Sequence, residues 1–158
     1  MTYTSVVNNT GGTQFTTRLY DGGFEFRKLG LQIAVGIGDD AWDTTPVAPL
    51  EYNTILTNEI ARVKPYWMGW LDESEYDRNK ILWSSAQTKI CRFVAKFPKS
   101  LFANDTRIQG FDLREIGLFM EARPDANSGL LVTETRHTRW WWDRSFSLRR
   151  EVILDMRG

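Results

Sequence analysis

Cysteine, histidine and net charge are nearly absent from this sequence. Its 158 residues include one cysteine, Cys91, and one histidine, His137. One cysteine excludes an internal disulfide, whereas small secreted scaffolds normally carry several pairs. Twenty Lys and Arg residues balance twenty Asp and Glu residues, so the formal net charge at pH 7 is zero. This balance provides no global attraction to nucleic acid or to an anionic membrane, and we expect neither as a partner.

Long hydrophobic runs are also missing. The most hydrophobic uncharged stretch, residues 29–38, is too short and too rich in glycine to span a bilayer. The first residues contain neither a basic region nor an apolar run, so we expect no signal peptide and a protein made in a cytoplasm. Hydrophobic residues still make up 42% of the chain, which excludes wholesale disorder. No repeat or linker divides the sequence, and we expect a single domain over residues 1–158.

Tryptophan, by contrast, is abundant. Aromatic residues make up 13% of the chain and seven of them are Trp, three in a row at residues 140–142. On a strand, neighbouring side chains point to opposite faces, so at least one of these three rings should lie on a polar face. A subunit interface, a lid over a core edge and a sugar-binding platform all remain open for this segment. The candidate assembly interface comprises Arg139, Trp140, Trp141, Trp142 and Arg144.

The dominant pattern of the chain is the period-two alternation of strands. Residues 31–37 alternate in this way, and so do residues 146–156, where only Arg150 breaks the apolar face. Further strands are expected at residues 15–20, 24–26, 66–71, 80–85, 89–97 and 111–120, and from residue 129 onward. The predicted sheet is mostly antiparallel.

One segment has helical spacing. Apolar residues at positions 52, 55, 56, 60 and 63 form one stripe, and Pro65 stops the pattern. This predicts one main amphipathic helix at about residues 50–63, packed on the sheet. Residues 1–12 show no period that would bury a face, so we expect an arm or a loose edge segment there. The predicted fold class is α+β.

Residues 36–43 contain the residue types of nucleotide and cation sites, but their spacing favours neither. Gly36 and Gly38 follow a predicted strand without the third glycine and the helix start of a dinucleotide-binding loop. Asp39, Asp40 and Asp43 lack the spacing of a calcium-binding EF-hand loop. A tight turn capped by aspartates is the favoured interpretation.

Two other groups of residues bear on catalysis. The acids at residues 72–77 lie near Trp67 and Trp70, but a glycosidase needs two carboxylates that face each other in a cleft. A zinc site or a cysteine nucleophile with a histidine base would have to be made from Cys91 and His137 alone. Cys91 alternates with apolar residues, which favours a buried thiol in the core. We therefore expect no enzyme, no metal and no cofactor.

Four segments taken together resemble a known family. They are residues 33–38 (IAVGIG), 56–63 (LTNEIARV), 113–119 (LREIGLF) and 129–132 (GLLV), and the third carries most of the specificity. Their order resembles the N-terminal, baseplate-attaching domain of bacteriophage tail fibres of the tail-collar type, over about residues 30–135. The resemblance implies a strand, a glycine turn and a helix, followed by two further strands.

Polar residues inside the resembling segments predict specific contacts. Glu59 interrupts an apolar stripe, and Glu115 lies within an apolar strand. Because buried charges are kept only when they have partners, we expect Glu59 or Glu115 to pair with Arg62 or Arg114, or with backbone donors. Gly117 would let the helix or another chain approach the strand closely.

The resemblance also implies a function. Fibres of that family continue into a long shaft and a receptor-binding tip, which these 158 residues do not include. It therefore implies a connector or adaptor subunit of a phage tail or a related contractile particle. Such a subunit is assembled in the bacterial host cytoplasm, is located in the virion tail, and has other tail or baseplate proteins as partners and a homotrimer as its default oligomer.

Uneven charge along the chain agrees with assembly by packing. Residues 136–158 carry six arginines and three acids, whereas residues 1–60 carry seven acids and three bases. Opposite charges suit packing between neighbours, although solvated faces are the simpler interpretation. The alternative function is a carbohydrate-binding module that binds a glycan on Trp67, Trp70 or residues 140–142.

Overall fold

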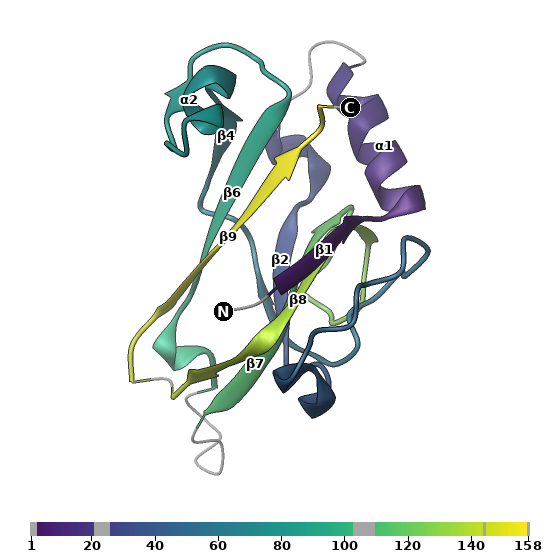
Figure 1. Cartoon of the computed structure of the whole chain (residues 1–158), viewed down its shortest axis with the longest axis vertical. Helices are drawn as coiled ribbons and strands as arrows, with labels where there is room; N and C mark the ends of the chain where they lie inside the picture. The colour runs from purple at the N-terminus through teal and green to yellow at the C-terminus, as the bar shows by residue number, and fades with distance from the viewer. Residues whose placement is uncertain (1–2, 21–25, 103–109, 144, 158) are drawn as a thin grey trace.

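The computed structural model describes residues 3–20, 26–102, 110–143 and 145–157, and these fold into two antiparallel sheets (Figure 1). The first sheet has the strand order β1 (Tyr3–Val7), β8 (Leu130–Trp142), β7 (Phe111–Met120), β2 (Gln32–Gly36) and β3 (Glu59–Val63). The second sheet has the order β5 (Trp83–Ser84), β4 (Trp67–Leu71), β6 (Ile90–Phe97) and β9 (Leu148–Asp155). The predicted α+β class, with a mostly antiparallel sheet and one main helix, is confirmed.

The core lies between the two sheets. Alternate residues of β2 and β7, such as Ile33 and Leu118, face alternate residues of β6 and β9, such as Phe93 and Leu154, in one buried cluster. This is the face-to-face packing of a β-sandwich, in which the inner faces of both sheets are apolar. The period-two pattern that predicted these strands is therefore the pattern of their buried faces.

The main helix is α1 (Asn9–Tyr20), not residues 50–63 as predicted. Figure 1 shows α1 at the end of the molecule where the C-terminus also lies. Phe15 is fully buried and meets the ring of Phe93 edge to face at 6.0 Å. At Gly11 a Cβ atom would lie 1.9 Å from the carbonyl oxygen of Leu131 in β8, so only glycine allows this approach. A weakly patterned segment thus becomes helical because of its tertiary contacts.

The N-terminal predictions are corrected in the same way. Within the predicted arm or loose edge segment at residues 1–12, residues 1 and 2 lie outside the described residues. The rest is not a loose arm, because β1 pairs with β8 from Tyr3 to Val7 and α1 begins at Asn9. β1 is nevertheless the edge strand of its sheet. The strand predicted at residues 15–20 is wrong, since these residues belong to α1. Of the strand predicted at residues 24–26, residues 24 and 25 lie outside the described residues, and Phe26 begins the 3-10 helix η1 (Phe26–Leu29).

An irregular segment at residues 44–58 takes the place of the predicted helix and covers the outer face of the first sheet. Leu56 is buried there against Ala34, Phe119 and Leu131. Gly117 makes room for it, because a Cβ atom at that position would lie 2.9 Å from Leu56 Cδ2. Apolar residues predicted to share a helix face, such as Tyr52, are instead exposed. Residues 59–63 pair with β2, so strand pairing overrides the helical spacing.

Three short helices complete the described fold. They are η2 (Asp40–Asp43), α2 (Glu73–Asp77) and η3 (Lys99–Phe102). The strands predicted at residues 66–71, 89–97, 111–120 and from 129 onward are confirmed, with small differences at their ends. The segment predicted at residues 80–85 contains only the short β5. The single domain over residues 1–158 stays a prediction.

Candidate functional site

The three consecutive tryptophans divide between the core and the surface. Trp142 is buried and packs against Phe97, with 6.3 Å between the ring centres. Its Nε1–H donates to the carbonyl oxygen of Phe146 at 3.1 Å. Trp140 is 38% exposed and Trp141 is 53% exposed. The segment therefore anchors the end of β8 with one ring and presents two rings at the surface.

Arginines accompany these surface rings. Arg139 is exposed, and its backbone N–H donates to Asp43 Oδ1 at 2.9 Å. The guanidinium of Arg150, in the neighbouring sheet, lies 5.1 Å from the centre of the Trp140 ring. Arg144 lies outside the described residues. An arginine thus stacks on a ring at this end of β8, and the interface at these residues stays a prediction.

A shift of register in β7 turns two neighbouring charged residues to the outer face of the first sheet. The pairing with β8 slips between Leu113 and Glu115, while Leu113 and Ile116 both belong to the core. Arg114 donates to both carboxylate oxygens of Asp43, at 2.8 and 3.0 Å. This hydrogen bonding holds the pKa of Asp43 below its ordinary value. Arg114 therefore fixes η2 to the sheet and does not pair with Glu59 or Glu115.

Glu59 and Arg62 form a buried ion pair. Arg62 Nε and Nη2 donate to the two carboxylate oxygens of Glu59, both at 2.7 Å. The side chains are 1% and 2% exposed for Glu59 and Arg62 respectively. Arg62 also donates to the carbonyl oxygens of Arg123 and Ser128 and lies 4.5 Å from the Phe119 ring centre. The pair connects β3 to the turn before β8, which is a structural role.

Two buried glutamates hold residues 44–58 on the sheet. Glu115 accepts hydrogen bonds from the backbone N–H groups of Thr57 and Asn58, at 2.9 and 2.6 Å. Glu134 accepts one from the side-chain amide of Asn53 at 2.7 Å, and its second oxygen has no partner among the described residues. Burial raises the pKa of both glutamates, since it disfavours the charged form. Their partners are groups of the covering segment itself.

A groove of about 490 Å³ opens between the edge strands β1 and β9. We call it the β1–β9 groove. It is lined in part by Ser5, Thr133, Thr135, His137, Arg150 and Val152. Hydroxyl groups thus face a guanidinium between two sheets whose other inward side chains are mostly apolar.

His137 and Arg150 form the polar centre of the β1–β9 groove. His137 Nδ1 donates to the carbonyl oxygen of Thr138 at 2.7 Å, which leaves Nε2 to accept from Arg150 Nη2 at 3.2 Å. Burial lowers the pKa of His137 to about 4, so the ring is neutral at pH 7. Burial also lowers the pKa of Arg150 to about 10. Arg150 Nη1 is buried without a hydrogen-bond partner among the described residues.

The turn after β2 contains no built cation or nucleotide site. Asp39 caps η2 by accepting from the backbone N–H of Ala41 at 2.9 Å. Gly38 has a φ of 57°, and a Cβ atom there would lie 2.4 Å from the Trp42 ring. No group of three or more His, Cys, Asp and Glu residues that could hold a metal ion occurs in the part of the chain that the structure describes. The aspartates cap and brace a tight turn.

The residues considered for hydrolysis have other contacts. Asp72 caps α2 by accepting from the backbone N–H of Glu75 at 2.9 Å. Trp70 faces Phe26, with 5.0 Å between the ring centres, so it is not a free surface platform. Cys91 is fully buried, and burial raises the pKa of its thiol. The side-chain hydrogen bonds of His137 go to Thr138 and Arg150, and not to Cys91.

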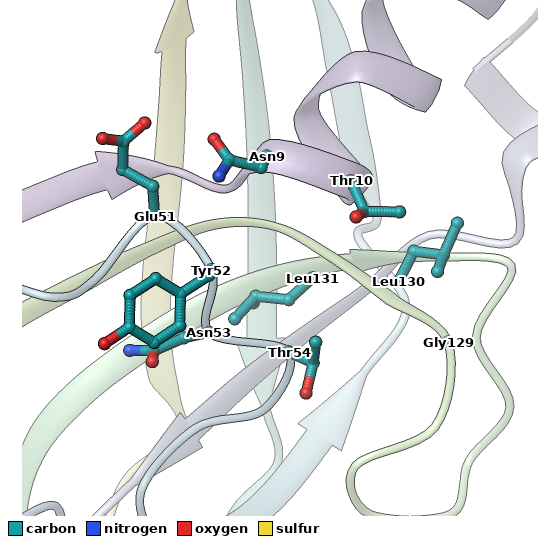
Figure 2. A pocket seen from close by; sticks show the side chains of 10 residues that line it. Asn9, Thr10, Glu51, Tyr52, Asn53, Thr54, Gly129, Leu130 and Leu131 are labelled. Atoms are coloured by element: carbon teal, nitrogen blue, oxygen red, sulfur yellow. The ribbon is translucent and has the colours of Figure 1, made fainter.

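Figure 2 shows a smaller cavity, of about 220 Å³, beside the first turn of α1. It lies between Asn9 and Thr10 of the helix, residues 51–54 of the covering segment, and residues 129–131 at the start of β8. The backbone N–H of Asn9 donates to the carbonyl oxygen of Glu51 at 2.8 Å across this junction. The cavity lies where three segments meet, and no buried charged residue is among the residues that line it.

The sequence analysis did not predict the β1–β9 groove. Arg150 was the one residue that broke the apolar face of the C-terminal strand, and that interruption was the available signal. Ser5, Thr133 and Thr135 give no such signal, because Ser and Thr on strands are ordinary. Their position beside Arg150 depends on the pairing of β1 with β8 and on how the two sheets pack.

None of the helices in the described ranges is long and apolar enough to cross a membrane. Comparison of the chain with models of protein families and with curated protein sequences gave no match.

Proposed function

We propose that this chain is a structural subunit of a bacteriophage tail, a connector or adaptor at the baseplate or tail fibre that acts by protein–protein assembly and not by catalysis. The main supporting observation is where the four segments of the family resemblance lie. Residues 33–38, 56–63, 113–119 and 129–132 form or flank β2, β3, β7 and the start of β8. These strands are adjacent in the order β8–β7–β2–β3. Segments far apart in sequence thus make one block of the sheet.

The polar residues of the resembling segments also brace this block. The Glu59–Arg62 pair ties β3 to the turn before β8, and Glu115 ties β7 to residues 57 and 58. The stretch that the resemblance implied to be helical is an irregular segment followed by β3. The proposal therefore rests on the shared strand block and its polar contacts, and not on that helix.

Surface rings supply a candidate contact with neighbouring subunits. Trp140, Trp141 and Phe146 lie near the turn between β8 and β9 and are 38%, 53% and 51% exposed. Trp is enriched among residues that dominate binding energy at interfaces, and exposed apolar groups rimmed by charge mark interaction sites. Arg139 adds charge beside them. In this proposal the virion tail is the location, other tail proteins are the partners, and a homotrimer is the default oligomer.

Solution mass tests the assembly part of the proposal. Light scattering at two concentrations should give a stable trimer, and Trp141→Ala should weaken its association about 30-fold or more, as for an interface hot spot. Trp67→Ala is the matched control, because Trp67 is 48% exposed but lies in the other sheet. A monomer at both concentrations would contradict the homotrimer.

Labelling tests the location. An antibody against the chain should bind the tails of the phage particles whose genome encodes it, as seen by electron microscopy. Binding only to free protein, or to no part of the particle, would contradict the tail assignment.

A carbohydrate-binding module is the alternative, and one observation favours it. Trp67 stacks on Trp83 with 5.0 Å between ring centres and 23° between ring planes, and the Arg92 guanidinium lies 5.3 Å from the Trp83 ring. Trp67 is 48% exposed, and an exposed ring supported by a second ring can stack on a sugar. A glycan-array screen tests this function: a hit that Trp67→Ala abolishes and Trp141→Ala retains would support it.

A further inference from the structure

We propose that the β1–β9 groove binds an extended acidic segment of a partner protein, with the carboxylate of an Asp or Glu side chain accepting hydrogen bonds from Arg150. This names the chemistry of a partner for the proposed assembly role and rests on that role.

The first argument is the unpaired charge. Three other buried or half-buried arginines in the described ranges have carboxylate partners: Arg62 with Glu59, Arg92 with Glu151 and Arg114 with Asp43. Arg136 has no carboxylate partner, but it donates to the carbonyl oxygen of Val47 and lies over the Trp42 ring. Arg150 has none there. Its contacts are the neutral His137 ring and the face of Trp140, and Nη1 has no partner. A buried cation is costly without a counter-charge, so the groove lacks one anion.

The second argument is the pair of free strand edges beside the groove. In the described chain β1 pairs only with β8, and β9 pairs only with β6. An edge strand presents unpaired backbone N–H and C=O groups, which an extended peptide can use to add a strand. The groove lies between these two edges. An extended polypeptide therefore fits the available hydrogen-bonding groups better than a compact ligand does.

The third argument is side-chain direction. Leu148 and Leu154 of β9 point into the core, so Arg150, at the same parity, points between the sheets. In an antiparallel pair, directly opposite residues lie roughly 4.5–5.5 Å apart at Cβ and share a face. A residue paired opposite Arg150 would thus place its carboxylate at the guanidinium. The residues two positions away on the added strand would face Leu148 and Val152, which favours apolar side chains there.

Charges around the groove favour a single carboxylate. Arg150 is the one Lys or Arg among the described residues that line it. A doubly charged anion such as phosphate would therefore meet only one cation there, whereas a single carboxylate matches its charge. The chain's own nearby acids have partners: Glu151 with Arg92, and Asp77 and Asp155 with Arg157. Since these described acids are already paired, we assign the carboxylate to another molecule.

The test uses the full chain and the probe peptide acetyl-Thr-Val-Thr-Glu-Thr-Val-Thr-amide, with a second peptide in which Gln replaces Glu. Binding is followed by NMR at the Arg150 Nε–H, the His137 ring and the backbone N–H groups of β9. The Glu peptide should shift all three sets of signals to saturation. The Gln peptide should bind about tenfold more weakly or worse, because it removes a charge-assisted hydrogen bond. Equal binding of the two peptides would overturn the proposal.

Two protein variants make the test specific. Arg150→Gln should lose the preference for the Glu peptide, whereas Arg149→Gln should keep it, because Arg149 is exposed on the neighbouring position of the same strand. Since the peptide comparison is made on the unaltered protein, poor folding of Arg150→Gln would leave the proposal falsifiable. Acetate or inorganic phosphate that binds as tightly as the Glu peptide would also overturn it, in favour of a site for free anions.

The proposed function and this inference can fail separately. If Trp141→Ala disrupts the trimer but neither peptide binds, the inference falls and the assembly role stands. If the Glu peptide binds as expected but the antibody labels no tail, the groove is a peptide site in a protein of another role. An oligomer that Arg150→Gln dissociates, together with no peptide binding, would assign the groove to a second copy of this chain and overturn the partner assignment.

Discussion

Two polar regions of this protein differ in how their buried charges are satisfied. On the outer face of the first sheet, Arg62 meets Glu59, Arg114 meets Asp43, and Glu115 accepts two backbone N–H groups. In the β1–β9 groove, Arg150 has a neutral histidine, a ring face and one nitrogen without a partner. These outer-face groups have their partners within the chain, although Glu134 Oε2 on the same face has none among the described residues. The arrangement in the groove is complete only if something else is added, and that difference separates a brace from a binding site.

The largest expected effect comes from breaking the outer-face ion pair. Arg62→Ala leaves Glu59 buried without its partner, so the free energy of unfolding should fall by about 3–5 kcal/mol. Arg123→Ala is the control, because the Arg123–Asp125 pair is solvent-exposed and should contribute less than about 1 kcal/mol. Urea unfolding of both variants measures the contrast. Equal losses would show that the buried pair is not a brace.

A pH effect in the β1–β9 groove should be next in size. The pKa of His137 is lowered from 6.5 to about 4 by burial, so the unfolded chain takes up this proton first as the pH falls. Stability from this group is complete above pH 6.5 and is lost as the pH falls toward 4, by about 3 kcal/mol in total. His137→Phe should flatten that part of the stability profile. NMR titration of the His137 ring checks the same shift, and a pKa near 6.5 would contradict it.

The two buried glutamates should respond differently to amide substitution. In Glu115→Gln one oxygen becomes an NH₂ group that faces the N–H of Thr57 or Asn58, so we expect a loss of about 1–3 kcal/mol. The measurement is denaturant unfolding at pH 7, together with proteolysis within residues 44–58. An unchanged free energy would show that Glu115 does not hold that segment.

Glu134→Gln is the matched contrast to Glu115→Gln. One oxygen of Glu134 accepts from Asn53 while the other has no partner, so a glutamine keeps the observed contact and should cost less than Glu115→Gln does. The pKa of Glu134 is raised on folding, so its charged form opposes folding above the ordinary value of 4.5. The free energy of unfolding of the variant, measured by denaturant unfolding, should therefore rise relative to that of the parent protein as the pH rises above 4.5.

The smallest stability effect should be at Arg150. Arg150→Met removes a buried cation that has no counter-charge, so the free energy of unfolding should stay within about 1 kcal/mol of the parent or rise. Arg149→Met, at an exposed position, controls for the change of side-chain type. If Arg150→Met lowers the free energy of unfolding as much as Arg62→Ala does, Arg150 already has partners that stabilise its charge within the chain. The two regions would then not differ.

Much of the sheet was predictable because strand burial follows a period of two along the chain. The strands at residues 31–37 and 146–156, the position of Arg150 on an inward face, and the need of Glu59 for a partner all follow from local pattern. The helix did not, because Gly11 and Phe15 become helical only against β8 and Phe93, which local spacing does not register. The prediction of a helix at residues 50–63 was wrong because residues 59–63 pair with β2 as a strand.

The fold class and the charges that need partners can be read from composition and alternation, because these decide which residues must be buried. The partners of those charges depend on the three-dimensional arrangement of the strands. The register of β7 turns Arg114 toward Asp43 and Glu115 toward residues 57 and 58. The packing of two sheets, each ending in an edge strand, leaves Arg150 facing a groove. Contacts between distant segments carry no local signal, since they depend on how the strands are ordered and paired in space.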